Sequence, residues 1–429
     1  MNSIYKTKTM RTLLISGNRE VCGPMTPLPL GLACVAAATI EAGFSVEVLD
    51  PLQTPDWQAA IRSAIATARP DAIGLSVRNI DDQTMTGTRF LLEPVKDIVA
   101  LCRELCDAPI VLGGPGFSIF PESVLAYLGA DMGIAGEGEA AFPNLLTWLK
   151  NGRQGIPPAG VYLAGAPPEH RPNYLQTITA DLNWLALPPP ALWLRGEIRP
   201  EWPIPVQTRR GCANACSYCS TGAIEGRQPR YRAPDAVVFW LARYCERGFR
   251  NFYFVDNTFN LPMNYAKELC RKIIEARLDI TWSAIVYPKW VDAELAELMA
   301  KAGCAEVSLG FESGSETVLR LLNKKFTPAE VAEVAAIFAA AGIKRNGFLL
   351  LGAPGDTRET VEESLAFAES LHLDFLKVSA GIRIYPKTAL AVRAVSEGLI
   401  ERGDDLLLPK FYCVPELREW LPRRIADYS

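Results

Sequence analysis

Short apolar runs alternate with helical segments along the first 150 residues, and this alternation restricts the possible folds more than any other feature of the sequence. The runs expected to be strands are residues 11–15, 44–50, 71–77, 109–114 and 131–136. The segments expected to be helices are residues 30–42, 57–68, 91–105 and 122–128, with a last one beginning near Glu139. Strands that alternate with helices build a parallel sheet with helices on both faces. The sequence therefore predicts a doubly wound α/β domain over residues 1–150.

Glycines follow the fourth and fifth of these strands, at the edge where sheets of this kind bind ligands. Five strands within residues 1–150 are consistent with a flavodoxin-like strand order. The glycines in question are Gly113, Gly114, Gly116, Gly136 and Gly138. Because glycine permits positive φ and a close approach of a ligand to the backbone, they are candidate cofactor contacts, although tight turns explain them equally well. No G-x-G-x-x-G segment opens the first helix, so dinucleotide binding has little support.

Composition and charge exclude several classes of protein. Of 429 residues 49% are hydrophobic, enough to bury a core, and the length suggests about two to three domains. The net charge of −4 is a poor match for a nucleic-acid-binding protein. The longest apolar candidate, residues 28–40, is shorter than the ~20 residues that span a bilayer, and the apolar run near the N-terminus is too short for a signal peptide. We therefore expect a cytoplasmic protein without a membrane or nucleic-acid partner.

A proline-rich stretch follows the first domain, over residues 151–205. It contains Trp184, Trp193 and Trp202. Tryptophans are costly to leave in water, so we expect this stretch to be a connector that lies over a surface. A second domain would then occupy residues 206–390, and residues 391–429 would form a tail that packs near the active site.

Three cysteines form a tight C-x3-C-x2-C array, Cys212, Cys216 and Cys219, directly after an apolar run. Thiolates favour zinc or iron–sulfur clusters. A structural zinc site takes four ligands, and no second C-x2-C or H-x3-H pair supplies the others. Three cysteines on a four-iron cluster leave one iron without a protein ligand, and a substrate or cosubstrate can bind there. The eleven cysteines are an odd number, which argues against a disulfide framework.

This array resembles the signature of the radical S-adenosylmethionine (SAM) superfamily. The resemblance implies a 4Fe–4S cluster on the three cysteines, with SAM as cosubstrate. It also places Tyr218, just before the third cysteine, against the SAM adenine. Similar enzymes fold as a partial (β/α)6 barrel, for which the six strands are residues 205–208, 251–256, 280–286, 306–312, 346–352 and 376–385. The intervening helices are residues 234–247, 262–277, 292–302, 315–322, 328–341 and 359–371.

Polar residues at the ends of these strands are the further candidates for binding SAM, because barrels of this kind carry their active sites at the carboxyl ends of the strands. Asp256 and Asn257 sit where the family binds the SAM amino group, with DNT in place of the more common GGE-type turn. Glu312 would hold the ribose or the amino group, and Ser283 would lie in a similar layer. We expect Asp256 and Glu312 to support SAM rather than the fold. Each of these residues could instead be a helix cap or a turn residue.

The flavodoxin-like first half makes the whole chain resemble the cobalamin-binding class of the superfamily. The loop after the first strand, residues 16–27, contains no histidine that could ligate cobalt from below. The two histidines, His170 and His372, lie outside the domain. Arg78, Asn79 and Cys22 are candidates to contact the lower face of cobalamin. The alternative for Arg78 is that it is a solvated charge on a loop.

The resemblance implies that cobalamin takes a methyl group from one SAM, and that a 5′-deoxyadenosyl radical from another activates the substrate. A cobalamin-dependent methyltransferase acting on an unactivated carbon of a small molecule is the leading hypothesis, with a flavodoxin or ferredoxin as electron donor. The alternatives are a cyclase, ring-contraction or rearrangement enzyme on the same fold, and a non-enzymatic corrinoid or redox-sensing protein. A nucleic-acid methylthiotransferase would require a basic C-terminal appendage, which the short tail does not resemble.

Overall fold

The computed structural model describes residues 9–19, 28–167, 172, 177–192 and 202–428. Contacts divide the chain into two compact units. Within the described ranges the first unit comprises residues 9–19, 29–80 and 91–192, and the second comprises Leu28, residues 81–90 and residues 202–428.

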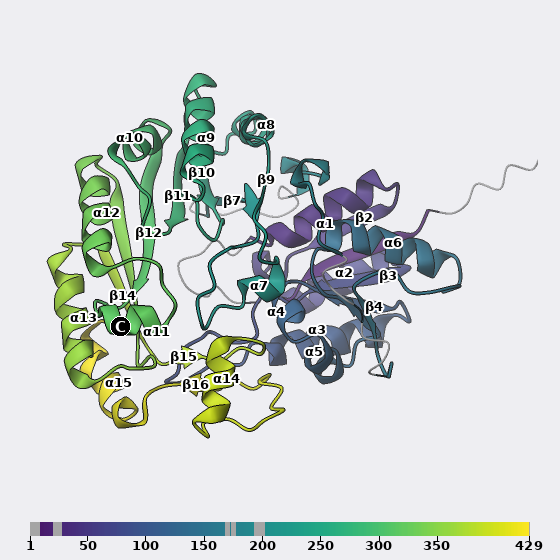
Figure 1. Cartoon of the computed structure of the whole chain (residues 1–429). Coiled ribbons are helices and arrows are strands. Elements are labelled where there is room, and N and C mark those ends of the chain that lie inside the picture. Colours follow the sequence, from purple (N-terminus) through teal and green to yellow (C-terminus); the bar gives the residue numbers. More distant parts are fainter. Residues whose placement is uncertain (1–8, 20–27, 168–171, 173–176, 193–201, 429) are drawn as a thin grey trace, which may run out of the picture. The chain divides into compact units, whose positions relative to one another are not determined.

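The first unit is built on one sheet with the strand order β2-β1-β3-β4-β5-β6 (Figure 1). Its strands are β1 Arg11–Ser16, β2 Ser45–Leu49, β3 Ala72–Ser76, β4 Ile110–Gly113, β5 Met132–Ile134 and β6 Val161–Leu163. The first five pair in parallel, which confirms the doubly wound, flavodoxin-like prediction. The sixth strand was not predicted: β6 comes from the connector and pairs antiparallel with β5.

The helices of the first unit are α1 Leu30–Glu41, α2 Trp57–Ala68, α3 Leu92–Leu105, α4 Pro115–Ile119, α5 Pro121–Leu128 and α6 Gly138–Lys150. Gly74, in β3, shows how closely α6 packs on the sheet. A Cβ atom there would lie 2.5 Å from Leu14 and 3.2 Å from the Phe142 ring. The short helix α4 was not predicted, since five residues are too few to show a helical period in the sequence.

The second unit contains a six-stranded, wholly parallel sheet with the order β14-β13-β12-β11-β10-β7. The strands are β7 Ile204–Val206, β10 Asn251–Phe254, β11 Thr281–Val286, β12 Cys304–Glu312, β13 Lys344–Leu351 and β14 Phe375–Ala380. Figure 1 shows the helices along one side of this sheet: α8 Pro234–Cys245, α9 Met263–Glu275, α10 Ala293–Lys301, α12 Pro328–Ala340 and α13 Arg358–Ser370, with the short α11 Glu316–Leu321. The partial (β/α)6 prediction is confirmed.

The last expected strand, residues 376–385, is interrupted at Gly381. β14 ends at Ala380, and the chain continues as β15 Ile382–Arg383, which pairs antiparallel with β16 Phe411–Tyr412. Gly381 has φ 72, and a Cβ atom there would lie 2.5 Å from the Met85 sulfur. Glycine is thus needed both for the left-handed backbone and for the approach of Met85.

Met85 belongs to residues 81–90, a segment that interrupts the first unit in sequence but packs within the second. A buried ion pair joins it to the strand that follows Gly381: Arg383 Nε lies 2.8 Å from Asp81 Oδ2, and both side chains are at most 2% exposed. The same guanidinium donates to the carbonyls of Ile384 and Leu406. No pattern in the sequence indicates that residues so far apart pair.

The connector differs from its prediction. Trp184 is 85% exposed, so the expectation that its tryptophans are covered is wrong for this residue. Trp202 is half-buried, and Trp193 lies outside the described residues.

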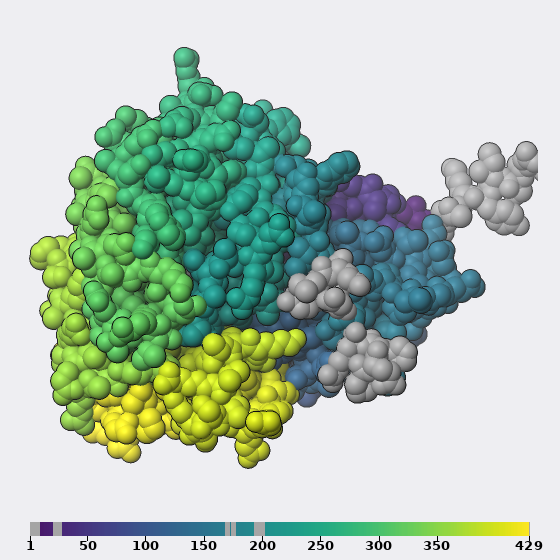
Figure 2. All heavy atoms as spheres, in the orientation of Figure 1, coloured from purple at the N-terminus to yellow at the C-terminus, as the bar shows by residue number. Residues whose placement is uncertain are grey.

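The tail after β15 contains α14 Ala389–Ser396 and α15 Trp420–Arg424, and Figure 2 shows it in yellow along the surface of the green part of the same unit. Val414 N–H donates to the carbonyl of Gly352, directly after β13. The tail therefore touches the carboxyl end of a central strand. None of the helices in the described part of the chain combines the length and apolar character needed to cross a bilayer.

Candidate functional site

The cysteine array forms a loop between β8 Arg209–Arg210 and α7 Thr221–Ile224, close after β7. Gly211 opens the loop with φ 84, and a Cβ atom there would lie 2.2 Å from the carbonyl oxygen of Gln228. The strand β9 Arg230–Tyr231 pairs antiparallel with β8 and closes the base of the loop. Within the loop, Cys219 N–H donates to the Cys216 carbonyl at 3.2 Å.

The three thiols share one electrostatic environment. Burial raises the pKa of Cys212, and negative charge on Cys219 and Cys216 raises it further. Burial also raises the pKa of Cys216, whereas the Lys324 ammonium lowers it. Cys219 is exposed. Within the described ranges no three His, Cys, Asp or Glu side chains are arranged to hold a single metal ion. A four-iron cluster takes its cysteines on separate irons. The cluster assignment therefore rests on the array and its loop.

A second segment, residues 322–324 after α11, holds the cysteine loop along its inner side. Ser217 N–H donates to the Leu322 carbonyl at 3.0 Å. Asn323 Nδ2 donates to the Ala215 carbonyl at 2.5 Å. On its other side, the Ser217 carbonyl accepts from Leu390 N–H at 2.8 Å. The loop is thus fixed through its backbone on both sides of the second cysteine, Cys216.

Glu312 stands at the end of β12 and is the centre of a small polar cluster. Its Oε1 atom accepts from the Tyr218 hydroxyl at 2.8 Å and lies 3.0 Å from Lys324 Nζ. Glu312 has φ 66, a left-handed conformation that is rare for a non-glycine residue and that marks functional sites when the surroundings enforce it. Its side chain is 14% exposed and that of Lys324 only 6%. The structure therefore brings Glu312, Tyr218 and Lys324 together, and the contact of Glu312 and Tyr218 with SAM stays a prediction.

Lys324 was not singled out from the sequence. It lies twelve residues after Glu312, beyond α11, and its ammonium is 5.4 Å from the centre of the Tyr218 ring. Lysine after a helix is usually a solvated surface residue. The only available signal was its position shortly after the polar run LGFESGSE at the end of the fourth strand.

Asp256 corrects one expectation. Its side chain is fully buried, and its carboxylate accepts from Thr208 N–H at 2.8 Å, Thr208 Oγ1 at 2.6 Å and Arg209 N–H at 3.2 Å. The buried Arg209 guanidinium lies 3.7 Å away. The expectation that Asp256 offers a carboxylate to SAM at the barrel mouth is wrong, because the chain leaving β7 occupies it. Asp256 instead fixes the start of the cysteine loop.

Asn257, the next residue, is half-buried and remains a candidate. Its Nδ2 donates to Glu225 Oε2 at 2.8 Å, and the same oxygen accepts from Gly211 N–H at 3.0 Å. Burial raises the pKa of Glu225. Asn257 is therefore tied to the two ends of the cysteine loop, a connection that the sequence did not indicate.

Ser283 is the third of six residues in β11, level with Tyr253 and Glu306 on the neighbouring strands. It does not end its strand, so the expectation that it lies in the same layer as Glu312 is wrong. It is half-buried on the face of the strand opposite Trp282 and Ala284.

The carboxyl edge of the first unit carries the candidate cobalamin contacts. Gly114 has φ 95 and a Cβ atom there would lie 2.6 Å from the Val77 carbonyl; one at Gly116 would lie 3.1 Å from the same oxygen. A Cβ atom at Gly138 would meet Val35 at 2.8 Å, whereas Gly113 is less restricted. Gly136 has φ 88. Internal packing and turns thus account for most of these glycines, and their contact with a cofactor stays a prediction.

Arg78 and Asn79 line a small cavity of about 20 Å³ at the same edge, together with Gly17, Asn18 and Arg19. Cys22, the third candidate for the lower face of cobalamin, and His170 lie outside the described residues. The loop after β1 is described as far as Arg19.

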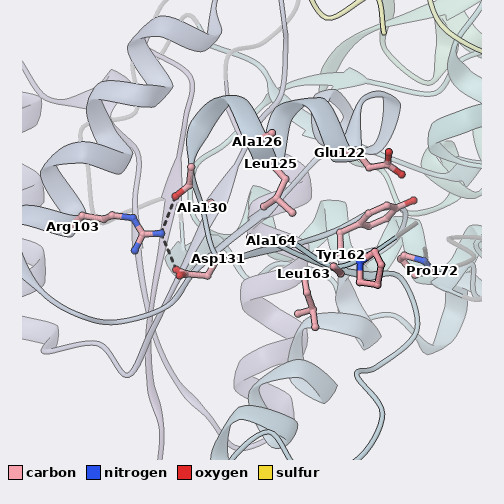
Figure 3. A pocket seen from close by; sticks show the side chains of 14 residues that line it. Arg103, Glu122, Leu125, Ala126, Ala130, Asp131, Tyr162, Leu163, Ala164 and Pro172 are labelled. Carbon is pink, nitrogen blue, oxygen red and sulfur yellow. Dashed lines mark hydrogen bonds and ion pairs between the residues drawn. The ribbon is translucent and has the colours of Figure 1, made fainter. Parts of the chain in front are cut away.

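A larger cavity of about 540 Å³ lies at the opposite edge of the first sheet (Figure 3). Arg103 and Asp131 close one side of it, with the Arg103 guanidinium 3.2 Å from Asp131 Oδ2. Asp131 immediately precedes β5, so this cavity is at the amino ends of the parallel strands. Ligands of doubly wound sheets bind at the carboxyl ends, and the cavity is therefore not the candidate site.

Two family models match the chain in separate segments. The radical SAM superfamily matches residues 206–368, and the B12 binding domain matches residues 22–146. An uncharacterised methyltransferase from Pyrococcus horikoshii is 26% identical over 92% of this chain and 85% of its own length. The tryptophan 2-C-methyltransferase from Streptomyces laurentii is 25% identical over 89% of this chain and 74% of its own length.

Solved structures share the fold across almost the whole chain. A radical SAM methyltransferase, TsrM, from Kitasatospora setae, solved with tryptophan substrate and a SAM analogue bound, superposes with a TM-score of 0.83 at 23% identity, covering 97% of this chain and 88% of its own. The cobalamin-dependent SAM radical enzyme OxsB, with aqua-cobalamin and SAM bound, superposes with a TM-score of 0.74 at 15% identity, covering 98% of this chain and 67% of its own.

Proposed function

The chain is a cobalamin-dependent radical SAM enzyme, and we propose that it is a methyltransferase that modifies an unactivated carbon of a small molecule. The observation that carries this proposal is the presence of both domains in one chain that aligns over most of its length with methyltransferases. These include the hopanoid C-2 methylase of Rhodopseudomonas palustris, at 26% identity over 92% of this chain.

The cysteine loop fits the group that the family requires. Three thiols lie on one loop whose backbone is held by hydrogen bonds at Ala215 and Ser217. Cys212, Cys216 and Cys219 would hold a 4Fe–4S cluster and leave one iron for SAM. The bound cofactors supply electron transfer, the radical and the methyl carrier, and the protein supplies position and the exclusion of water.

Neighbouring side chains would orient SAM next to the cluster. Glu312 carries a carboxylate at the end of β12 that suits the amino group or the ribose hydroxyls of SAM. Tyr218 is fixed by its hydroxyl to Glu312, which holds the ring beside the loop. Asn257 is linked to both ends of the loop through Glu225. In the first unit, Arg78, Asn79 and the carboxyl-edge glycines would face cobalamin, without a histidine among the described residues of the loop after β1.

Methyl transfer can be tested before the substrate is known. The protein would be reconstituted without oxygen with iron, sulfide and hydroxocobalamin, reduced, and supplied with SAM labelled as CD3. We expect S-adenosylhomocysteine to form together with a deuterated methyl group on the corrinoid, both measured by mass spectrometry. Recovery of neither product from protein that has bound cobalamin and its cluster would contradict the methyltransferase proposal.

The cleavage of SAM to a radical by the cluster is tested separately, with variants of the cysteines. Replacing all three loop cysteines by alanine should abolish formation of 5′-deoxyadenosine from SAM, because no cluster remains to donate the electron. The matched control is Cys270→Ala, which removes a buried cysteine outside the loop. That variant should keep four irons per chain.

A cyclase is the second candidate. The anaerobic magnesium-protoporphyrin IX monomethyl ester cyclase of Rubrivivax gelatinosus is 27% identical over 85% of this chain. This reading predicts 5′-deoxyadenosine without any transfer of the CD3 group. The two labelled products therefore distinguish the candidates in one experiment.

A further inference from the structure

Lys324 is a buried cation placed behind the cysteine loop. Its side chain is 6% exposed, and its ammonium lies 3.0 Å from Glu312 Oε1 and 3.5 Å from the Gly310 carbonyl. The rings of Tyr218 and Phe326 stand 5.4 and 5.8 Å from it. A lysine is seldom buried unless a specific partner or function requires it. The ion pair with Glu312 provides one such partner.

The position of Lys324 is enforced by the same segment that fixes the loop. Leu322 and Asn323 bind the backbone of the loop at Ser217 and Ala215. Asn323 has φ 58, which turns the chain so that the next side chain enters the site. The ammonium lies 5.4 Å from the centre of the Tyr218 ring, and Tyr218 stands between the second and third cysteines of the loop. Lys324 therefore contacts the cysteine loop as well as a carboxylate.

Charge near an iron–sulfur cluster sets its reduction potential, together with hydrogen bonds to sulfur and exposure to solvent. Reduction adds one negative charge to a cluster that its thiolates already make anionic. A fixed positive charge in a site of low dielectric stabilises the reduced form more than the oxidised form. Water and salt screen a cation that is buried to this degree much less than an exposed one.

We propose that Lys324 is a positioning residue that aligns the cysteine loop and raises the reduction potential of its cluster. Glu312 then has two tasks, since it holds the ammonium in place and presents its carboxylate toward SAM. This inference rests on the proposed cluster site and adds to it a residue that controls when the cluster accepts an electron. The alternative is that Lys324 only neutralises Glu312.

The test is a redox titration of the reconstituted protein, followed by the EPR signal of the reduced cluster. Lys324→Met keeps an unbranched side chain that is one atom shorter and removes the charge, so the midpoint potential should move to a more negative value. Glu312→Gln removes the opposing charge and should move it to a less negative value. The midpoint potential of the double variant Lys324→Met with Glu312→Gln should lie between those of Lys324→Met and the unmodified protein, because Lys324 is the more deeply buried of the two charges and is screened less.

The matched control is Lys301→Met, which removes the same single charge from an exposed position at the end of α10. Its midpoint potential should equal that of the unmodified protein. Iron and sulfide content and the melting temperature of every variant establish that the loop is still formed. If Lys324→Met retains four irons and an unchanged potential, Lys324 only neutralises Glu312 and the proposal is overturned.

Loss of the cluster from Lys324→Met alone would leave its potential unmeasured, and the double variant then decides. Its neutral pair leaves no buried charge without a partner, and a potential equal to that of the unmodified protein would also overturn the proposal. Failure of the unmodified protein to bind any cluster would contradict the proposed function instead. The two failures are therefore distinguishable.

Discussion

The ends of β10 and β12 carry carboxylates that look equivalent in sequence but serve different purposes in the structure. Asp256, after β10, is fully buried and accepts three hydrogen bonds from Thr208 and Arg209. Glu312, at the end of β12, is 14% exposed and shares one oxygen between Tyr218 and Lys324. The position of a carboxylate at a strand end therefore does not reveal its role. Its donors and its exposure do: Asp256 is enclosed by two backbone N–H groups and the Thr208 hydroxyl, whereas Glu312 stays partly exposed and is held by two side chains.

Removing Asp256 should have the largest effect on stability. Asp256→Ala leaves the Arg209 guanidinium buried without its counter-ion, and breaking a buried pair costs about 3–5 kcal/mol. We expect a matching drop in the free energy of unfolding, measured by denaturant titration of the apoprotein. Asp235→Ala, which loses only an exposed ion pair with Lys272, is the control and should change stability by less than about 1 kcal/mol. A stable Asp256→Ala protein that has lost only SAM binding would restore the expectation drawn from the sequence.

Asp81→Ala should have the second largest effect. It should lower the free energy of unfolding by about 3 kcal/mol, because it breaks the other fully buried ion pair, between Asp81 and Arg383. The loss should fall on the second unit, to which residues 81–90 belong. Hydrogen exchange should show faster exchange in β15 and β16, while β1 and β3 keep their protection. Asp82→Ala removes the neighbouring carboxylate, whose partner Arg89 is 53% exposed, and serves as the control. Equal loss of protection in both units would contradict the division described here.

Thr208→Val should lower the free energy of unfolding by about 2 kcal/mol, since it removes one of the three donors to Asp256. Hydrogen bonds to charged groups contribute about 1.5–3 kcal/mol to stability. The change is nearly isosteric, and the two backbone donors remain. Thermal unfolding should therefore show an intermediate melting temperature between the unmodified protein and Asp256→Ala. A melting temperature as low as that of Asp256→Ala would mean that the backbone donors contribute little.

Glu312→Gln should have the smallest effect on stability, about 1 kcal/mol in the cluster-loaded protein, because the amide oxygen still accepts from Tyr218 and Lys324 and the proposed anionic cluster offsets the Lys324 charge. Its effect on function should be large: weaker SAM binding and little 5′-deoxyadenosine. Equilibrium dialysis with labelled SAM measures the first and chromatography the second. Unchanged SAM affinity with a melting temperature as low as that of Asp256→Ala would remove the distinction between the two carboxylates.

The strands of both sheets could be predicted because each is a short apolar run separated from the next by a helix. The short β6 and α4 could not, since a strand of three residues and a helix of five leave no recognisable period. Contacts between residues far apart in the sequence could not be predicted either. The donors to Asp256 lie about fifty residues before it, and Arg383 is 302 positions from Asp81.

Lys324 and Trp184 illustrate two further reasons why the structure could not be predicted completely from the sequence. The burial of Lys324 depends on the left-handed residues Glu312 and Asn323, which redirect the chain and which no residue pattern announces. Trp184 was expected to be covered because of its chemistry, yet it is 85% exposed. Preferences of residue types are averages, and they do not determine a single side chain in an irregular segment.

Cys212, Cys216 and Cys219 should hold one cluster whose fourth iron is open to SAM. Mössbauer spectroscopy of protein reconstituted with 57Fe, recorded with and without SAM, is the decisive experiment. We expect four irons per chain, one of which changes its isomer shift when SAM is added, and no cluster spectrum after replacement of the three cysteines by alanine. Four irons that all keep their parameters in the presence of SAM, or a cluster that persists in the triple variant, would contradict it.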